Sequence, residues 1–121
     1  MFCVVSRRRE ALELIEKDLK TWYPSVVVVL CEYDRDFERV MCSSDSLPML
    51  IITDDSASSF ADGHSMGYGH EISHFAGDHD IDIVRFSSHG YWPSLLRGKI
   101  AFTLDLKRRL QQFGKKFQHN Q

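Results

Sequence analysis

The residues most able to do chemistry in this sequence lie in one histidine-rich stretch, GHEISHFAGDHD, at positions 69–80. His70 and His74 are four residues apart, and Glu71 lies between them. On a helix this spacing turns both imidazoles to one side, where they can bind zinc while the glutamate polarises a metal-bound water. The stretch therefore allows a small zinc-dependent, metallopeptidase-like hydrolase with Glu71 as its base.

The surrounding sequence argues against that chemistry. A third zinc ligand would have to be Asp80, which fits the extended metzincin spacing, or His79. Two glycines precede the first histidine, and each glycine costs about 1 kcal/mol in a helix. All four methionines lie upstream of the second histidine, so the methionine turn of that pattern is impossible. We expect residues 56–80 to form a long loop and expect no cofactor, with zinc as the alternative.

Apolar runs alternate with amphipathic stretches along the rest of the chain. The predicted strands are 2–5, 26–30, 48–53 and 81–86, and the predicted helices are 10–22, 34–42, 88–97 and a last one from Thr103 to Gly114. Continuous β-branched runs are typical of parallel strands that helices cover on both faces. The pattern predicts an α/β fold with a parallel sheet and right-handed crossovers, irregular between the third and fourth strands.

Composition excludes several other classes of protein. The formal net charge is −2 and the pI about 6.3, so no strong overall field attracts nucleic acid. The cysteine count is odd, and Cys3 and Cys31 lie in apolar runs, which favours reduced thiols in a cytoplasmic protein. We find neither a signal peptide nor an apolar run of transmembrane length, and expect no membrane contact.

Three segments carry a resemblance to a known family. SLLRGKIAFTLDLKRRL (94–110) resembles the junction after the receiver domain of LuxR/NarL/FixJ-type response regulators. PMLIITDD (48–55) resembles the third receiver strand and puts Asp54 at the phosphoacceptor position, while FCVVSRRREALELIEKDL (2–19) resembles the first strand and helix. The resemblance covers most of the chain and implies a receiver-like (flavodoxin-like) three-layer sandwich.

The resemblance also implies how the chain is divided and what it contacts. Residues 1–97 would form the receiver-like domain, and residues 98–121 a linker or dimerisation helix with a polar tail. Leu106, Leu110 and Phe113 would contact a second copy or another regulator. DNA would be reached only through a helix-turn-helix that is not among these residues.

The segment after the first strand departs from the family pattern. A receiver needs an acidic pair there to hold magnesium, and this chain has Ser6, Arg7 and Arg8 instead. We expect Arg7 and Arg8 to form an acidic and basic pocket with Asp54 and Asp55. Such a pocket predicts a degenerate receiver that phosphorylation does not control.

The leading hypothesis is therefore a non-enzymatic regulatory and dimerisation domain of a bacterial transcription regulator. The zinc hydrolase is the first alternative, and a free-standing interaction module or inhibitor is the second. Arginines such as Arg85 and Arg97 are available to a small anionic ligand, but the sequence identifies none.

Overall fold

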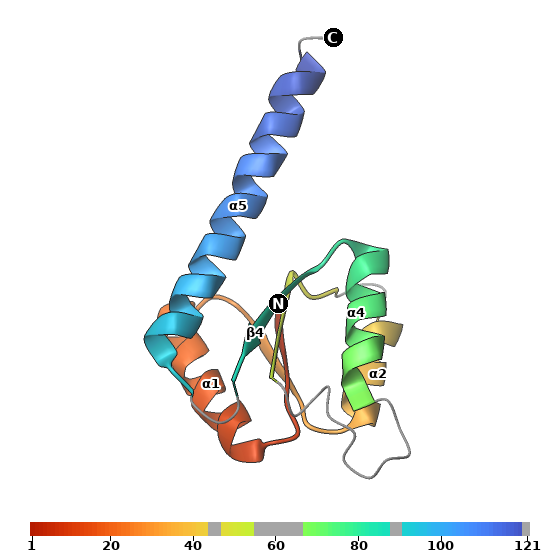
Figure 1. Cartoon of the computed structure of the whole chain (residues 1–121), viewed down its shortest axis with the longest axis vertical. Helices are drawn as coiled ribbons and strands as arrows, with labels where there is room; N and C mark the ends of the chain where they lie inside the picture. Colours follow the sequence, from red (N-terminus) through yellow and green to blue (C-terminus); the bar gives the residue numbers. More distant parts are fainter. Residues whose placement is uncertain (44–46, 55–66, 88–90, 120–121) are drawn as a thin grey trace.

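The computed structural model describes residues 1–43, 47–54, 67–87 and 91–119. Strands and helices alternate along the chain (Figure 1). The elements are β1 (Phe2–Val5), α1 (Arg9–Trp22), β2 (Val28–Cys31), α2 (Asp34–Cys42), β3 (Leu50–Asp54), α4 (Gly67–His79), β4 (Asp82–Phe86) and α5 (Pro93–His119).

The four strands form one parallel sheet in the order β2-β1-β3-β4. Val4 of β1 lies opposite Leu30 of β2 and Ile52 of β3 in the register. The central strands β1 and β3 are buried along their whole length, as expected for strands without polar alternation. The predicted α/β fold with a parallel sheet between helices is confirmed.

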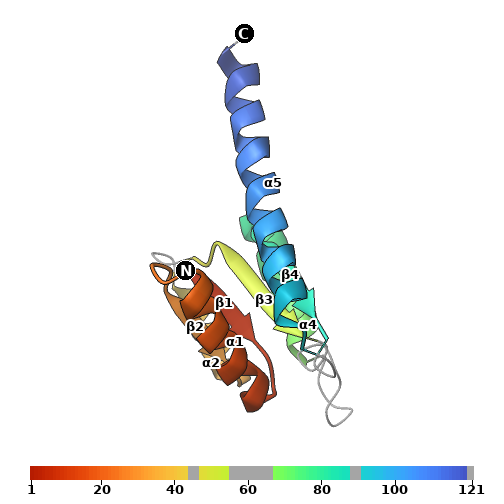
Figure 2. The same ribbon diagram turned by 90° about the vertical axis from the view of Figure 1, so that its left-hand side faces the viewer.

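Two apolar cores lie on the two faces of this sheet, because successive side chains of a strand point to opposite faces. Helices α1 and α5 cover one face, and α2 and α4 cover the other (Figures 1 and 2). Val4 and Ile52 belong to the first core, whereas Val5 and Ile51 belong to the second. The arrangement is the three-layer sandwich that the sequence predicts.

Helix α4 corrects the prediction of a loop over residues 56–80, as far as that prediction falls on residues 67–79. Ile72, Phe75 and Ala76 are buried in the second core at helical spacing. Burying an apolar stripe against the sheet stabilises the helix by more than its glycines cost. Residues 55–66 of the predicted loop lie outside the described residues.

Helix α5 corrects the prediction of two shorter helices. It runs without a break from Pro93 to His119, through Gly98 and Gly114. Thr103 does not cap a new helix, since its hydroxyl donates to the Lys99 carbonyl oxygen one turn earlier, at 2.8 Å. The expected boundary between residues 97 and 98 therefore falls inside one helix.

No helix of the described residues is long and apolar enough to cross a membrane.

Candidate functional site

The carboxyl ends of β1 and β3 bring Asp54, a predicted pocket residue, into contact with Ser6, which was not predicted as one. The Ser6 hydroxyl donates to Asp54 Oδ2 at 2.7 Å, and the backbone N–H of Arg8 donates to Ser6 Oγ at 3.1 Å. Ser6 is 0% and Asp54 1% exposed. A buried carboxylate needs such donors, because an unsatisfied one carries a large desolvation cost.

The Ser6 hydroxyl therefore holds the buried Asp54 carboxylate, a contact that was not predicted from the sequence. Arg7 is half-buried beside the end of β1, and the Arg8 side chain is exposed at the start of α1. Asp55, the fourth predicted pocket residue, lies outside the described residues. A phosphoryl group on Asp54 would have to displace the Ser6 hydroxyl from a buried position.

The predicted zinc residues lie at α4 and just after it. Positions 70 and 74 are one turn apart on this helix, although the side chains of His70 and Glu71 lie outside the description. His74 Nε2 lies 3.7 Å from Asp78 Oδ2 on the exposed side of α4. Across the described residues, no group of three or more His, Cys, Asp or Glu side chains is arranged to hold a metal ion.

His79 and Asp80, the two candidates for a third ligand, have structural contacts of their own. The His79 ring packs on Phe75 with their centroids 4.7 Å apart. Asp80 has φ 55°, and the Ile81 N–H donates to the Ala76 carbonyl oxygen at 2.8 Å. This is the Schellman ending of a helix, in which aspartate is one of the few residues other than glycine to adopt a left-handed conformation.

Cys3 and Cys31 form a buried thiol pair on neighbouring strands. Their sulfur atoms are 3.6 Å apart, and both side chains are 0% exposed. The hydrogen bond with Cys31, together with burial, raises the pKa of the Cys3 thiol far above its usual range. Both side chains belong to the second apolar core and are closed off from solvent, so this pair contributes to the packing of the core.

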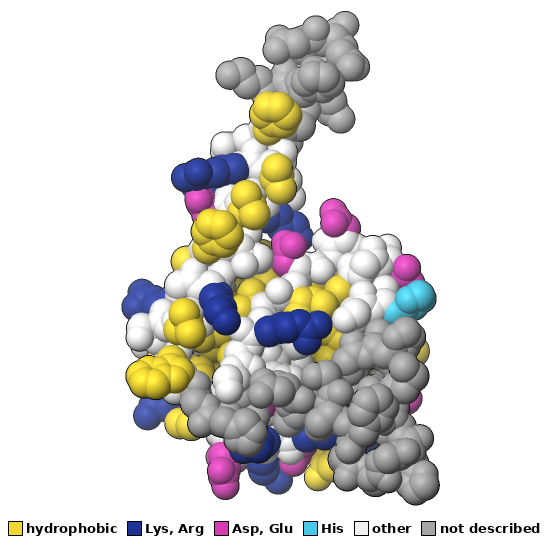
Figure 3. Space-filling model, viewed as in Figure 1, with side chains coloured by type: hydrophobic (Ala, Val, Ile, Leu, Met, Phe, Trp, Pro, Cys, Tyr) yellow, Lys and Arg dark blue, Asp and Glu magenta, His cyan; other side chains and the backbone are white. Residues whose placement is uncertain are grey.

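Among the described residues, six of the eleven exposed large apolar side chains lie on α5 or directly before it. Six side chains, which we call the α5 stripe, are 46–69% exposed: Trp92, Leu95, Phe102, Leu106, Leu110 and Phe113. Hydrophobic side chains follow one another along α5 on the face that Figure 3 shows. Trp92 directly precedes the helix and accepts the Leu96 N–H at 3.0 Å, so it continues the helical geometry. Helical spacing thus gathers all six on one side of the helix.

Only part of this stripe was predicted from the sequence. Leu106, Leu110 and Phe113 were identified as contact residues, and they are exposed on α5 as that role requires. Trp92, Leu95 and Phe102 were missed, because the predicted break at Gly98 assigned them to a different element or to none. Their spacing of three, four and seven residues would have revealed them if the helix had been continued through the glycine.

The first turns of α5 are fixed to the body of the molecule. Leu96 and Ile100 are buried in the first core. Just before the helix, the Tyr91 hydroxyl donates to Asp18 Oδ2 of α1 at 2.6 Å, and burial together with this bond raises the Tyr91 pKa well above its usual value. The Arg97 guanidinium lies over the Trp22 ring, 5.7 Å from its centroid. The second half of α5 extends away from the body (Figure 1), supported by this base.

A groove follows the stripe where α5 leaves the sheet. It has a volume of about 420 Å³. Its lining comes from the start of β4 and from one side of α5: Asp80, Asp82, Ile83, Thr103, Leu106, Lys107, Leu110 and Gln111. The groove therefore joins apolar residues of the stripe to two exposed or half-exposed aspartates.

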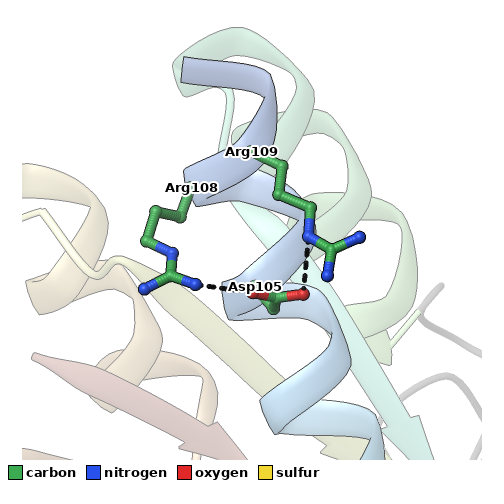
Figure 4. A network of polar contacts seen from close by, with 3 residues as sticks. All are labelled: Asp105, Arg108 and Arg109. Carbon is green, nitrogen blue, oxygen red and sulfur yellow. Dashed lines mark hydrogen bonds and ion pairs between the residues drawn. The ribbon is translucent and has the colours of Figure 1, made fainter. Parts of the chain in front are cut away.

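Another part of α5 carries a small charged network. Asp105 accepts from Arg108 Nη2 through Oδ1 and from Arg109 Nε through Oδ2, each at 3.0 Å (Figure 4). All three side chains are exposed to a large extent, so these pairs contribute little to the free energy of unfolding. These pairs keep Arg108 and Arg109 at the side of the α5 stripe, so the two arginines do not cover its apolar side chains.

Comparison with known proteins gives no match: no family model, no curated protein and no solved structure matches this chain. The α/β fold and the geometry of α5 are therefore the observations on which a function must be proposed.

Proposed function

We propose that the chain is a non-enzymatic regulatory and dimerisation domain of a bacterial transcription regulator, and that α5 makes its protein contact. The observation that carries this proposal is the α5 stripe. Exposed apolar patches on monomeric proteins seldom exceed about 300–600 Å². A helix that keeps six large apolar side chains in water is unfavourable unless a partner covers them.

The area of the stripe supports a stable contact. Leucine and aromatic side chains at this exposure each offer about 100 Å², so the six offer about 600 Å² on each copy. A symmetric pair would bury about 1,200 Å² from these side chains alone, which is the lower end of stable interfaces. The remaining contacts of α5 would add to this area.

The strand-end residues support regulation without phosphorylation. Asp54 accepts a hydrogen bond from Ser6, and the first strand is followed by Ser6, Arg7 and Arg8 in place of acidic residues. Magnesium prefers carboxylate oxygens, which this segment does not offer. Incubation with acetyl phosphate should leave Asp54 unlabelled, and an acid-labile phosphoryl group on Asp54 would contradict this part of the proposal.

Sedimentation equilibrium tests the dimer. The wild-type chain should sediment with twice the mass of 14.0 kDa, and Leu106→Ala with Leu110→Ala should raise the dimer Kd at least tenfold. Leu14→Ala is a matched control, since Leu14 is an exposed leucine of α1 and should leave the Kd unchanged. A wild-type chain that remains monomeric at about 100 µM, far above ordinary dimer Kd values, would refute the proposed dimer.

A zinc hydrolase remains the second candidate, because α4 is helical and its positions 70 and 74 are one turn apart. Metal analysis of untagged protein tests it. Stoichiometric zinc that is lost in both His70→Ala and His74→Ala would favour the hydrolase, and zinc-free protein would dismiss it.

A further inference from the structure

We infer that the α5 stripe pairs with the same stripe of a second copy, and that the two helices are antiparallel. In this arrangement Trp92 lies opposite Phe113 of the second copy, and Leu95 lies opposite its Leu110. The inference rests on the proposed dimer and adds the orientation and register of its helices.

The spacing of the stripe is almost the same in both directions along the helix. The stripe occupies positions 92, 95, 102, 106, 110 and 113, and Lys99 fills the place between 95 and 102. About a midpoint between residues 102 and 103, position 92 pairs with 113, 95 with 110, and 99 with 106. A two-fold interface requires this self-complementarity, because every contact between two positions occurs twice, once in each direction between the copies.

The stripe is also narrow enough for two helices to share. At 100° per residue its members fall within an arc of roughly 80°. This width corresponds to the seam of a two-stranded coiled coil and not to the wider face that a globular core covers. The buried residues Leu96 and Ile100 lie outside the arc, so a second helix can pack on the stripe without displacing α5 from its own sheet.

Lys99 distinguishes the two possible orientations. In a parallel pair in register, Lys99 of one copy would face Lys99 of the other. Two like charges in one contact are unfavourable. In the antiparallel register, Lys99 lies opposite Leu106, which lines the groove together with Asp80 and Asp82. The Lys99 ammonium group donates to the exposed Arg85 carbonyl oxygen at 3.0 Å. In this register it adds a positive charge near Asp82, which already lies 3.9 Å from Lys107 Nζ of its own copy.

The distribution of charge along the chain favours the same orientation. Residues 93–119 contain seven basic side chains and one acidic side chain, whereas residues 1–92 contain eight basic and sixteen acidic ones. The second half of α5 extends from its own body, so antiparallel pairing lays this basic segment beside the acidic domain of the other copy. A basic amphipathic helix could also bind an anionic lipid surface, but the groove beside it carries two aspartates and one lysine, which suits a basic segment better than an anionic one.

Distances between spin labels test the orientation. Exposed Cys42 is first replaced by serine, and buried Cys3 and Cys31 are left in place. Labels are then attached at Gln112→Cys or at Ala101→Cys, which are exposed positions outside the stripe. In the antiparallel dimer, position 112 of one copy lies opposite position 93 of the other, which is nineteen residues before position 112 of that second helix. The two labels at position 112 are therefore separated by about 30 Å along the axis.

Ala101 is the matched control, because its copies lie only three residues apart along the antiparallel axis, or about 5 Å. The label distance should therefore be clearly longer at position 112 than at position 101. A dimer with equal distances at both positions would overturn the antiparallel inference and leave the proposed dimer intact. A monomeric mass would instead refute the proposed dimer itself.

A charge exchange tests the register. Lys99→Glu should raise the dimer Kd about tenfold by bringing a carboxylate to Asp82, and Asp82→Lys in the same chain should restore much of the affinity. Lys17→Glu, an exposed change on α1, is the control and should have no effect. A Kd that Asp82→Lys leaves unrestored would contradict the register.

Discussion

Both halves of α5 carry large apolar side chains, but only the first half also buries some of them in the core. Leu96 and Ile100, in the first half, are 1% and 0% exposed, whereas Leu110 and Phe113, in the second half, are 63% and 68% exposed. The first half packs on the sheet and on α1, and the second half extends beyond both (Figure 2). The first half therefore stabilises the fold through Leu96 and Ile100 while it also exposes Leu95 and Phe102. In the second half, Leu110 and Phe113 are exposed and only the contact surface continues.

The difference shows why an amphipathic helix does not define its own role. Burial of an apolar side chain is favourable wherever the apolar surface comes from, either the same chain or another one. The length of the sheet, together with the side of α5 that faces it, decides which residues of α5 are covered within one copy. The uncovered residues then determine how much apolar surface a second copy can bury, and so how favourable dimerisation is.

The largest expected effect contrasts the two halves directly. Ile100→Ala should lower the free energy of unfolding by about 2–5 kcal/mol, because it leaves a cavity in a buried core. Leu110→Ala should change it by at most about 0.5 kcal/mol when urea unfolding is measured well below the dimer Kd. Equal losses would mean that the second half of α5 packs on its own domain in solution.

Ser6→Ala tests the contact between the ends of β1 and β3 and should cost about 1–3 kcal/mol, because the buried Asp54 carboxylate loses the hydrogen bond from Ser6. Thr21→Ala is the matched control, since the Thr21 hydroxyl bonds an exposed helix carbonyl oxygen of Lys17. Urea unfolding should show little change for the control. An equally small change for Ser6→Ala would argue that the Ser6–Asp54 bond contributes nothing to folding.

Gly98→Ala examines the continuity between the two halves. An added Cβ at Gly98 meets no atom within 4 Å, so alanine should stabilise the helix by about 0.5–1 kcal/mol. Gly77→Ala offers the same test in α4, where the added Cβ is also in open space. Thermal unfolding would register both gains, and a loss at Gly98 alone would indicate that α5 needs a break there.

The smallest effect concerns the contact that fixes the base of α5. Burial and the bond to Asp18 raise the Tyr91 pKa, so the folded state favours the neutral phenol. This contribution is complete below about pH 10, the ordinary tyrosine pKa, and is lost as the pH rises towards the higher folded value. The fall in Tm above pH 10 should be shallower in Tyr91→Phe than in the wild-type chain, and an unchanged slope would contradict this contribution.

The sequence predicted most of the elements but not their lengths. The strand at Phe2–Val5 and the helix at Asp34–Cys42 have the predicted bounds, because each is a short segment with a clear apolar pattern. Gly98 misled the prediction of α5, since a single glycine costs about 1 kcal/mol and packing of Leu96 and Ile100 exceeds it. The same competition explains α4, where Ile72, Phe75 and Ala76 are buried despite nearby glycines.

The candidate site was predicted in part. The resemblance pointed to Asp54 and to three residues of α5, but the Ser6 contact and the groove beside Asp82 were not foreseen. Ser6 and Asp54 are 48 residues apart, and only the parallel register of β1 and β3 brings them within 2.7 Å. Such contacts depend on pairing between distant segments, which local patterns do not specify.

By itself, the sequence determined the α/β class, the buried strands and the amphipathic character of the last helix, because periodicity and side-chain volume fix these locally. The tertiary structure alone decided that α4 and α5 remain helical through their glycines. It also decided that the sheet ends before α5 does. That difference in length exposes Leu110 and Phe113, because a side chain is buried only where another layer reaches it. Leu95 and Phe102 are exposed because they lie on a different side of α5 from the buried Leu96 and Ile100.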